Sequence, residues 1–519
     1  MLSQNFCIFA AVINHISDYK MKLNLFKLFV LLALPFATAN AADVNMKFGK
    51  PTKEEMQMTT YEADPDADAV VLCRLTDVEY TIEFNGYLVD YHEKCRIKVL
   101  KPGGERFAKV VVPYNRDVAG SDRIGASTFS LKSLQFSMGS TTSAVFEDMG
   151  GSMIDNSAGS YTDEEVMDIK ATAFNQEGSK VVKTNLKKSD IKTTKLDETS
   201  YQLEFTVPNV KVGTVIEYEY TIHSQLYWQL RDWYAQCDIP VVYAKLDMNI
   251  PNYLLFNIEE QGIQRLSCSC TTGMMRYKLE SDPLAAPVVV NTNHYVCVGR
   301  NLAAIPKLDG MWNVNDYSAG ITTELRRYSV RGSNMMDYAK TWDQVDSMIF
   351  ESDDLGKRLN NHSPLAAEIK ARDIPSMEFQ RQRVEAVCKL VMSKVRWNGK
   401  YALSPVDPAE TLKKGEGSNA DINLLLIQSL AEVGVTATPV LLRTRDLGML
   451  PYNFPSIRKI STFLVGVILP GGSKAYLDAS SPSGSLNDLP SLMLVERARL
   501  LQKGHKSQWI NLQKLEKVN

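Results

Sequence analysis

The chain has 519 residues, of which 45% are hydrophobic and 23% are charged, and its formal net charge is −2 at pH 7. This composition is typical of globular proteins, and the length predicts more than one domain. Because the net charge is near zero and there is no long run of like charges, the sequence lacks the electrostatic signature of nucleic-acid binding. We expect no nucleic-acid partner.

The N-terminus carries a targeting signal. From Met21, two lysines precede an apolar run that ends in the small-residue sequence at residues 39–41. This pattern predicts a secretory signal peptide with cleavage after Ala41, and it makes residues 1–20 an upstream extension. The apolar run is too short, and the segment after it too polar, for a stable membrane span. We therefore expect a periplasmic or otherwise exported protein.

The cysteines and histidines predict no metal site and no cofactor. Of eight cysteines, Cys7 precedes the predicted cleavage, and the other seven are Cys73, Cys95, Cys237, Cys268, Cys270, Cys297 and Cys388. An odd number leaves at least one cysteine unpaired or paired between chains, and the sequence does not fix the pairing. The Cys-Ser-Cys motif at 268–270 is too short for a zinc knuckle, and the six histidines are isolated.

Residues 42–330 carry the pattern of β-strands. Two alternating runs flank Asn85-Gly86, which is a strong signal for a tight hairpin. A further alternating run predicts one buried and one polar face, with Ile216, Tyr218, Tyr220 and Ile222 on the first and Glu217, Glu219 and Thr221 on the second. We expect an N-terminal domain of antiparallel strands arranged as a β-sandwich or as two stacked sheets.

Residues 118–165 interrupt this pattern. The stretch is rich in Ser, Gly and Thr and has weak periodicity, which predicts a long surface excursion from the β-rich domain. Two alternatives remain open: the excursion folds over a ligand, or it contacts a partner.

From Asn334 onward the hydrophobic period becomes helical. The clearest stripe is formed by Val384, Val387, Val391 and Val395. A strand at TPVLLRT and a hairpin that turns at Gly471-Gly472 follow. Helices followed by strands predict an α+β domain over residues 331–510.

The stretch GEGSNADINLLL, residues 415–426, predicts a helix with a defined start. Ser418 precedes Asp421 by three positions, which is a variant of the capping box in which the Ser418 hydroxyl accepts from the backbone N–H of Asp421. A carboxylate in the first turn also favours the helix dipole. These interactions explain both residues without any catalysis.

The same stretch strongly resembles the nucleophile loop of transglutaminase-like proteins, which have a papain-like architecture. In that family a glycine-rich turn presents a Cys at a helix N-terminus, where its pKa is lowered. The stretches VRWNGKY, TPVLLRT and AYLDAS are similar to neighbouring family elements. The first half resembles an uncharacterised β-domain found ahead of such domains in exported bacterial proteins, at KTNLKKSDI, PNVKVGTVIEYEY and WYAQCDIPV. Together the resemblance covers nearly all of the chain after the signal peptide.

Taken residue by residue, the resemblance implies that catalytic residues are missing. Asn419 occupies the place of the family's Cys, and Thr462 or Phe463 occupies the place of its general-base His. Asp478 matches the acid that orients the His. The resemblance therefore implies a catalytically degenerate domain with degenerate positions Asn419, Phe463 and Asp478.

The distribution of Cys and His supports this interpretation independently. No Cys follows Cys388, and no His lies between His362 and His505. Ser418 is the fallback nucleophile, but a serine hydroxyl needs an adjacent base, and Asp421 is a weak base unless it is buried.

A family cleft that has lost its catalytic residues can still bind a ligand. We expect the lining to comprise Trp397, Asn398, Tyr401, Ser418, Asn419, Asp421 and Asp478, with Arg443 and Asp446 at the mouth. An aromatic ring beside amides and a carboxylate suits a peptide or a sugar equally well.

Three functions remain open at this point. The first is a binding protein for a peptide, cell-wall or glycan ligand, or for an envelope protein partner. The second is an amide hydrolase or acyltransferase that uses Ser418. The third is a structural subunit of an envelope assembly.

Overall fold

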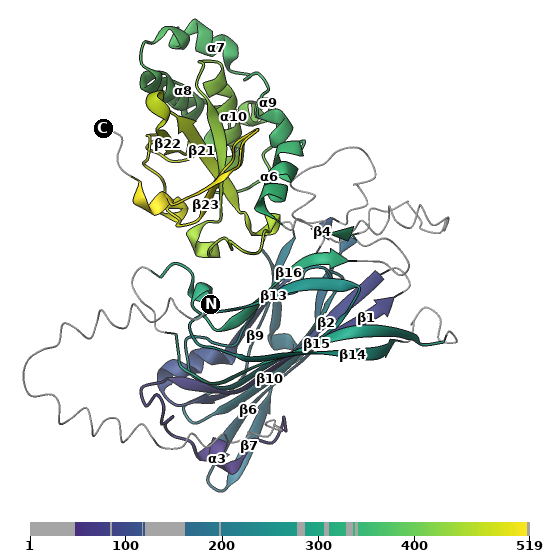
Figure 1. Cartoon of the computed structure of the whole chain (residues 1–519). Helices are drawn as coiled ribbons and strands as arrows, with labels where there is room; N and C mark the ends of the chain where they lie inside the picture. The colour runs from purple at the N-terminus through teal and green to yellow at the C-terminus, as the bar shows by residue number, and fades with distance from the viewer. Residues whose placement is uncertain are drawn as a thin grey trace, which may run out of the picture. The chain divides into compact units, whose positions relative to one another are not determined.

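The structure is a computed structural model that describes residues 47–83, 86–116, 118–119, 161–196, 199–277, 286–305, 311–328, 336–337 and 341–515. The predicted signal peptide and most of the 118–165 excursion lie outside these residues. A short helix, α3 (Lys53–Gln57), precedes the strands. Strands dominate the first part of the chain and helices gather in the last part (Figure 1).

The largest sheet of the described residues has eight strands in the order β14-β15-β12-β1-β2-β10-β6-β7. Its strands are β1 (Ala69–Glu83), β2 (Gly86–Val99), β6 (Glu164–Glu177), β7 (Lys180–Asn185), β10 (Val215–Ser224), β12 (Val241–Pro251), β14 (Ser267–Tyr277) and β15 (Val288–Leu302). β1 and β2 form the hairpin that the sequence predicts, since Glu83 pairs with Gly86.

The expectation of a purely antiparallel β-domain is wrong at one position. β1 and β12 pair in parallel, with Val71 opposite Val241 and Glu79 opposite Asn249. A parallel pair needs a long crossover connection, and here the chain between the two strands supplies it. Strand periodicity reports which face is buried but not which way a neighbouring strand runs.

The predicted polar face of β10 is partly buried. Glu217 is only 4% exposed, because the segment around α3 lies over it. The Glu217 carboxylate accepts from Nε of Arg96 at 2.7 Å, and Nη1 of Arg96 also donates to Glu55 at 2.9 Å. Nearby, Nζ of the fully buried Lys98 donates to the carbonyl of Met56 at 2.8 Å, and burial lowers the pKa of Lys98 to about 8. Ion pairs and apolar contact together hold this segment on the sheet, since Met56 of α3 forms a buried cluster with Phe174 and Val215.

Two smaller sheets complete the strand-rich part. One contains β3 (Lys109–Asn115), β8 (Ile191–Lys195) and β9 (Ser200–Thr206), and the other contains β11 (Trp233–Tyr234), β13 (Leu254–Gln261), β16 (Gly320–Tyr328) and β17 (Met336–Asp337). Nε1 of Trp233 donates to Thr76 on β1 at 2.9 Å. A cavity of about 140 Å³ is lined by Val78 of β1 and Val112 of β3. Both smaller sheets therefore pack near the same face of the large sheet.

The two ends of the 118–165 excursion are ordered strands. β4 (Val118–Ala119) pairs with β5 (Tyr161–Thr162), and β6 already begins at Glu164. The excursion is therefore shorter than the composition indicates, and its centre lies outside the described residues.

Helices and a five-stranded sheet form the last part. The helices are α6 (Trp342–Glu351), α7 (Ala366–Ala371), α8 (Gln380–Lys394), α9 (Pro408–Lys414) and α10 (Asn419–Ala431). The sheet has the order β22-β21-β20-β23-β24, with β20 (Ala437–Leu442), β21 (Thr462–Ile468), β22 (Lys474–Leu477), β23 (Ala498–Leu500) and β24 (Gln508–Ile510). A short parallel pair, β18 (Arg396–Trp397) and β19 (Glu416–Gly417), lies beside α10. This mixture of sheets and helices fits the predicted α+β class.

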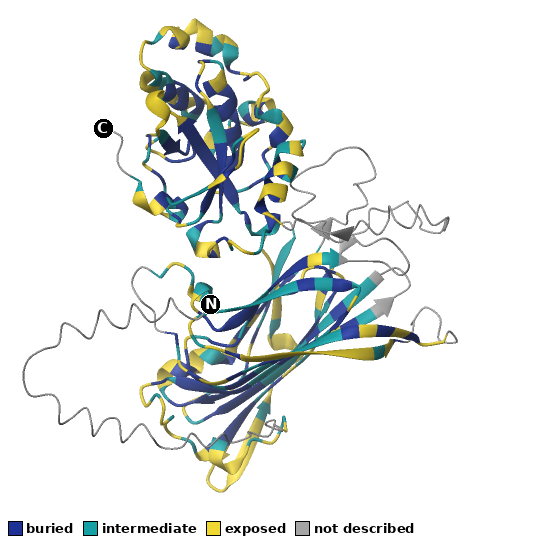
Figure 2. Cartoon of the chain, viewed as in Figure 1, coloured by how far each residue is buried: buried dark blue, intermediate teal, exposed yellow. Residues whose placement is uncertain are grey.

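α10 is the central element of this part. Every residue from Asn419 to Leu430 is buried, and the helix is drawn almost wholly in dark blue (Figure 2). A helix buried on all sides belongs to the core, and its buried polar side chains therefore need hydrogen-bond partners. The valine stripe of α8 is buried as predicted, and the hairpin between β21 and β22 turns at Gly471-Gly472, which both have positive φ.

A buried charge pair joins α6 to the sheet. Nε and Nη2 of Arg499 on β23 donate to the two carboxylate oxygens of Asp346 at 2.7 Å and 2.5 Å. Arg499 is 2% exposed and Asp346 is 5% exposed. The guanidinium also lies over the rings of Trp342 and Trp509, and its Nη2 donates to the more exposed Asp343 at 3.0 Å.

Residues from Phe48 onward form one compact unit, and the boundary at 330/331 remains a prediction. Among the described residues, no helix has the length and apolar character required to cross a membrane.

Arg499→Met would leave the Asp346 carboxylate buried without its partner. We expect the free energy of unfolding to fall by about 3–5 kcal/mol, because breaking a buried pair strands a charge. Urea denaturation of both proteins measures this change. The double variant Arg499→Met with Asp346→Leu is the control and should recover most of the loss. A single variant with wild-type stability would contradict the burial of this pair.

Candidate functional site

The capping box at the start of α10 is confirmed. The Ser418 hydroxyl accepts from the backbone N–H of Asp421 at 3.3 Å, and the Asp421 carboxylate accepts from the N–H of Ser418 at 2.7 Å. The second carboxylate oxygen accepts from the N–H of Val406 at 2.7 Å. Gly417 permits this arrangement, because a Cβ there would lie only 2.9 Å from that of Asp421.

Asn419, at the position where the resemblance places a Cys, makes three side-chain hydrogen bonds. Its Nδ2 donates to the carbonyl of Phe463 at 3.1 Å. Its Oδ1 accepts from the N–H of Ala402 at 3.1 Å and from the Thr462 hydroxyl at 2.7 Å. The residue is 0% exposed. This buried amide ties α10 to β21 and to the loop at Ala402.

Asn423 repeats the contact one helical turn later. Its Nδ2 donates to the same Phe463 carbonyl at 3.0 Å and to Oδ1 of Asp478 at 2.9 Å. Its Oδ1 accepts from the N–H of Ala479 at 3.0 Å. The Asp478 carboxylate also accepts from the hydroxyl of Ser480 at 2.7 Å. The acid that the resemblance assigns to orienting a His is therefore held by an amide and a hydroxyl.

Burial changes the proton affinity of this acid. Asp478 is 1% exposed, and desolvation raises its pKa above the ordinary value, although hydrogen bonds from Ser480 and Asn423 act in the opposite direction. Desolvation also raises the pKa of the Tyr401 phenol to about 12, and the charge of Asp478 adds to this effect.

The aromatic residues of the predicted cleft lie together beside α10. The rings of Trp397 and Tyr401 are 5.2 Å apart, and Nε1 of Trp397 donates to the carbonyl of Lys400 at 3.0 Å. The exposed Asn398 accepts from the N–H of Lys400 at 3.0 Å. These contacts close a local turn in front of the buried network.

Ser418 has no base among its hydrogen-bond partners in the described residues. The hydroxyl accepts from a backbone N–H, the residue is 7% exposed, and the Asp421 carboxylate is bound to two other N–H groups. A nucleophilic serine requires a group that takes its proton, and this geometry does not provide one.

Arg443 and Asp446, placed at the cleft mouth by the sequence, line a separate cavity of about 530 Å³. Ser418, Asn419, Asp421 and Asp478 are not among its lining residues. Its polar walls include Asp232, Tyr234, Asn257, Glu259, Gln261, Asn313, Asn315, Asp316, Ser456, Lys459 and Arg497. The volume lies in the range of small-ligand sites.

Arg443 is the cation of interest in this cavity. Asp232 is bound to Lys459 at 3.1 Å and Asp316 to the N–H of Met449 at 3.2 Å, and the structure shows no hydrogen bond or ion pair of the Arg443 side chain to a described residue. Desolvation lowers the pKa of Arg443, whereas Asp232 and Asp316 act to raise it. An arginine keeps its charge under such conditions, so a partly buried cation faces the cavity.

Two further groups in the cavity wall are unsatisfied within the described residues. The hydroxyl of Ser456, a residue that is 3% exposed, and Nε of Arg497 have no hydrogen-bond partner. The carboxyl group of Glu259 lies in the same wall, and burial raises its pKa. Unsatisfied buried polar groups are rare in folded proteins and often mark sites that bind something.

Sequence reasoning did not identify most of these residues. The sequence weakly indicated Asn423, because it is a polar residue in a leucine-rich helical turn. Nothing in the sequence indicated Thr462 or Ser480. Asp232, Glu259 and Asp316 are more than a hundred positions before Arg443, and no motif links them. The described residues also contain no group of three or more His, Cys, Asp or Glu side chains arranged for a metal ion.

No known protein family matches the chain, and no curated protein is similar to it in sequence. Among solved structures, the chain is similar to a protein from Parabacteroides distasonis described as a "putative protease". The identity is 11% and the TM-score is 0.42, over 82% of this chain and 72% of the other. At that distance the likeness assigns neither a family nor an activity.

Asp478→Asn tests the buried acid through its pH dependence. The raised pKa means that the folded protein binds more protons than the unfolded chain, so the free energy of unfolding falls as pH rises through this window. The window begins near the unfolded value, about 3.9. Asparagine keeps one oxygen for Asn423 and can donate to the Ser480 hydroxyl.

We expect the stability of the wild type relative to Asp478→Asn to decline with increasing pH above about 4 and then to level off. Urea denaturation of both proteins over a pH series measures this difference in the free energy of unfolding. Parallel curves for the two proteins would show that Asp478 has no raised pKa.

Proposed function

We propose that this chain is an exported, transglutaminase-like protein that is catalytically degenerate and binds a peptide, cell-wall or glycan ligand or an envelope protein partner. One observation carries the proposal. The positions that the resemblance assigns to catalysis, Asn419, Phe463 and Asp478, form a buried network together with Asn423. Such a network stabilises the fold and offers neither a nucleophile nor a general base.

The accessible polar cavity around Arg443 is the best candidate for the ligand site. Arg443 and Asp446 lie in the loop after β20, and β20 is the strand that follows α10 in the chain. The cavity and the buried network are therefore built on the same helix and strand. A scaffold of rigid strands with polar side chains on loops is the usual construction of a binding site.

The walls indicate the chemistry of the ligand. The guanidinium of Arg443 can donate two parallel hydrogen bonds to a carboxylate of the ligand. Glu259 and Asp316 would accept hydrogen bonds from ammonium, amide or hydroxyl groups of the ligand. Amides at Asn257 and Gln261 both donate and accept. A highly charged anion would be repelled by the surrounding carboxylates. This combination therefore favours a short peptide with a free carboxyl end, including a stem peptide of the cell wall, over a bare glycan.

A fluorophosphonate probe separates this proposal from a serine hydrolase. We expect no adduct by intact mass on the mature protein, because the Ser418 hydroxyl serves as a helix cap and has no adjacent base. Ser418→Ala is the matched control. Stoichiometric labelling that disappears in this variant would establish an activated Ser418 and make the chain an amide hydrolase or acyltransferase.

Arg443→Met tests the binding site. We expect a tripeptide with a free C-terminal carboxylate to bind the wild type, and both C-terminal amidation and Arg443→Met to weaken binding roughly tenfold or more, since a hydrogen bond to a charged group contributes about 1.5–3 kcal/mol. Isothermal titration calorimetry measures the dissociation constant of each tripeptide for each protein. Arg445→Met, in the same loop but over the ring of Trp312, is the control and should bind normally. Equal affinity for the free and amidated tripeptides would exclude Arg443 as a carboxylate site.

A further inference from the structure

β14 is an edge strand of the eight-stranded sheet. It pairs with β15 on one side, and no described strand pairs with the other side. Its residues from Ser267 to Met274 are all exposed, and the strand is largely yellow in Figure 2. A long edge of this kind presents unpaired backbone N–H and C=O groups to any strand that can approach it.

Two other edge strands of the described sheets, β7 and β8, carry the lysines that normally prevent such pairing. β7 contains Lys180 and Lys183, and β8 contains Lys192 and Lys195. In β14 the first charge is Arg276, near the end of the strand, and the strand has no proline. Its pairing with β15 runs without a bulge. This edge therefore lacks the features that block strand addition.

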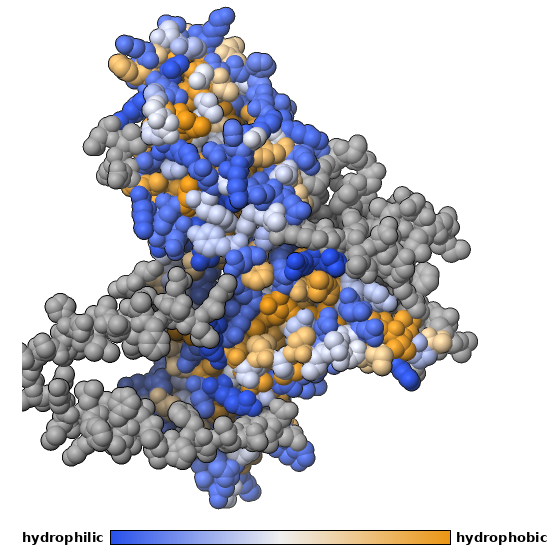
Figure 3. All heavy atoms as spheres, in the orientation of Figure 1, coloured by the Kyte–Doolittle hydropathy of each residue, from blue (hydrophilic) through white to orange (hydrophobic). Residues whose placement is uncertain are grey.

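The far end of the same hairpin is also apolar at the surface. Met274 is 74% exposed and Val289 on β15 is 54% exposed. Orange residues gather toward this end of the hairpin on the face shown in Figure 3. A strand added along β14 would cover part of this surface.

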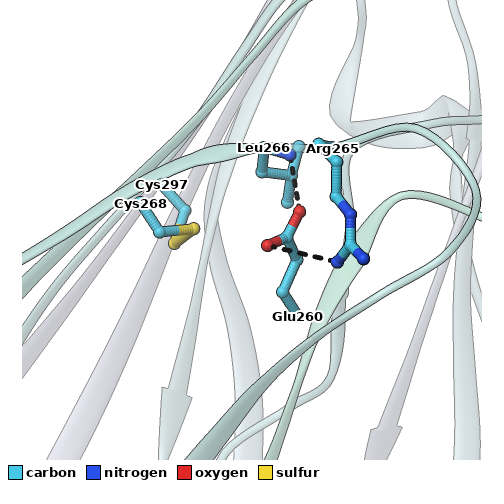
Figure 4. Close-up of a disulfide and its surroundings, with 5 residues drawn as sticks. All are labelled: Glu260, Arg265, Leu266, Cys268 and Cys297. Atoms are coloured by element: carbon cyan, nitrogen blue, oxygen red, sulfur yellow. Dashed lines mark hydrogen bonds and ion pairs between the residues drawn. A yellow bond between two sulfur atoms is a disulfide. The ribbon is translucent and has the colours of Figure 1, made fainter. Parts of the chain in front are cut away.

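A disulfide links the edge strand to β15, and the close pair that it joins shows in which direction the backbone groups of β14 point. Cys268 on β14 is bonded to Cys297 on β15, with a Cα–Cα distance of 4.1 Å (Figure 4). Directly opposite residues this close form a non-hydrogen-bonded pair, in which both residues point their N–H and C=O away from each other. Cys268, Cys270 and Thr272 therefore direct their backbone groups to the free edge.

Cys270 is the exposed free thiol of the described residues. The other free cysteines are buried or half-buried: Cys73, Cys95, Cys237 and Cys388. Cys270 thus combines an accessible sulfur with outward backbone groups at the centre of an uncharged edge.

We propose that a second copy of this chain adds to β14 by antiparallel strand pairing, and that the two Cys270 residues, opposite each other at the two-fold axis, form a disulfide between the copies. In this register Ser269 lies opposite Thr271, Cys268 opposite Thr272, and Ser267 opposite Gly273. These side chains are small and uncharged, so no like charges meet across the two-fold axis.

The proposed register suits a disulfide. Because Cys270 points its backbone groups outward, the two Cys270 residues form a hydrogen-bonded pair across the interface, and such pairs have Cα atoms about 5.5 Å apart. That distance lies within the usual disulfide range of about 4.4–6.8 Å.

The chemistry needs an oxidant, and a small disulfide such as oxidised glutathione supplies it. The thiolate of Cys270 in one copy attacks a glutathione disulfide and releases one glutathione thiolate. The thiolate of Cys270 in the second copy attacks the resulting mixed disulfide and releases the second glutathione. Each protein thiol loses one proton, one glutathione disulfide is reduced to two thiols, and the protein disulfide is formed.

The test uses the mature chain equilibrated with oxidised glutathione. Light scattering after size-exclusion chromatography and non-reducing electrophoresis measure the noncovalent and covalent dimers. We expect a covalent dimer of the wild type and of Cys237→Ser, none of Cys270→Ser, and a tryptic peptide that links Cys270 to Cys270. A wild type that stays monomeric, or a Cys270 linked to Cys268 or Cys297, would overturn the proposal.

A second variant tests the strand pairing separately from the thiol. Thr272→Pro, in the Cys270→Ser background, removes an outward N–H while leaving the ladder with β15 intact. We expect the noncovalent dimer to weaken at least about tenfold, because each copy loses a hydrogen bond. Thr272→Val keeps the N–H and should dimerise normally. Unchanged dimerisation of a folded Thr272→Pro, verified by its thermal melting, would show that the copies do not meet along β14.

Discussion

The carbonyl of Phe463 is the acceptor on which the helical part of this protein depends. Two asparagines of α10, one turn apart, donate to it at 3.1 Å and 3.0 Å. The same two amides bind Thr462 and Asp478, so α10, β21, the loop at Ala402 and the turn after β22 share a single network. In a buried, low-dielectric environment each of these groups would be costly if left unpaired. The network therefore fixes the position of α10 against the sheet more precisely than apolar contact can.

At the start of α10 the polar side chains hold the fold together. A catalytic centre keeps a nucleophile and a base poised and partly unsatisfied, whereas Asn419 is 0% exposed and its side chain bonds to Phe463, Ala402 and Thr462. The capping box uses Ser418 and Asp421 in the same way. A helix N-terminus that could activate a nucleophile is here devoted to holding the fold. Two buried polar groups that lack partners among the described residues, the Ser456 hydroxyl and Nε of Arg497, lie in the wall of the cavity around Arg443.

In the strand-rich part, buried polar contacts also fix the position of a segment, here the one around α3. Arg96 and Glu217 are buried together with Lys98 under the α3 segment. Burying charges costs free energy unless they are paired, so these contacts specify where the segment lies rather than adding much stability. Among the described residues no strand covers the outer edge of β14, and its lack of charge before Arg276 distinguishes it from β7 and β8. Such an edge offers unpaired backbone groups to another strand.

The sequence by itself determined the local features. Alternation predicts the β1–β2 hairpin, three-and-four spacing predicts α8, and the Ser418–Asp421 pair predicts the start of α10, because each depends on residues close together in the chain. The absence of a nearby Cys and His also needed no structure. The tertiary structure alone decided that β12 runs parallel to β1, that Glu217 is buried, that Asn423 holds Asp478, and that Arg443 meets Asp232 and Asp316 at one cavity. These features depend on contacts between segments that are far apart in the sequence. The periodicity of side chains shows which face of an element is buried, but not which distant segment packs against it.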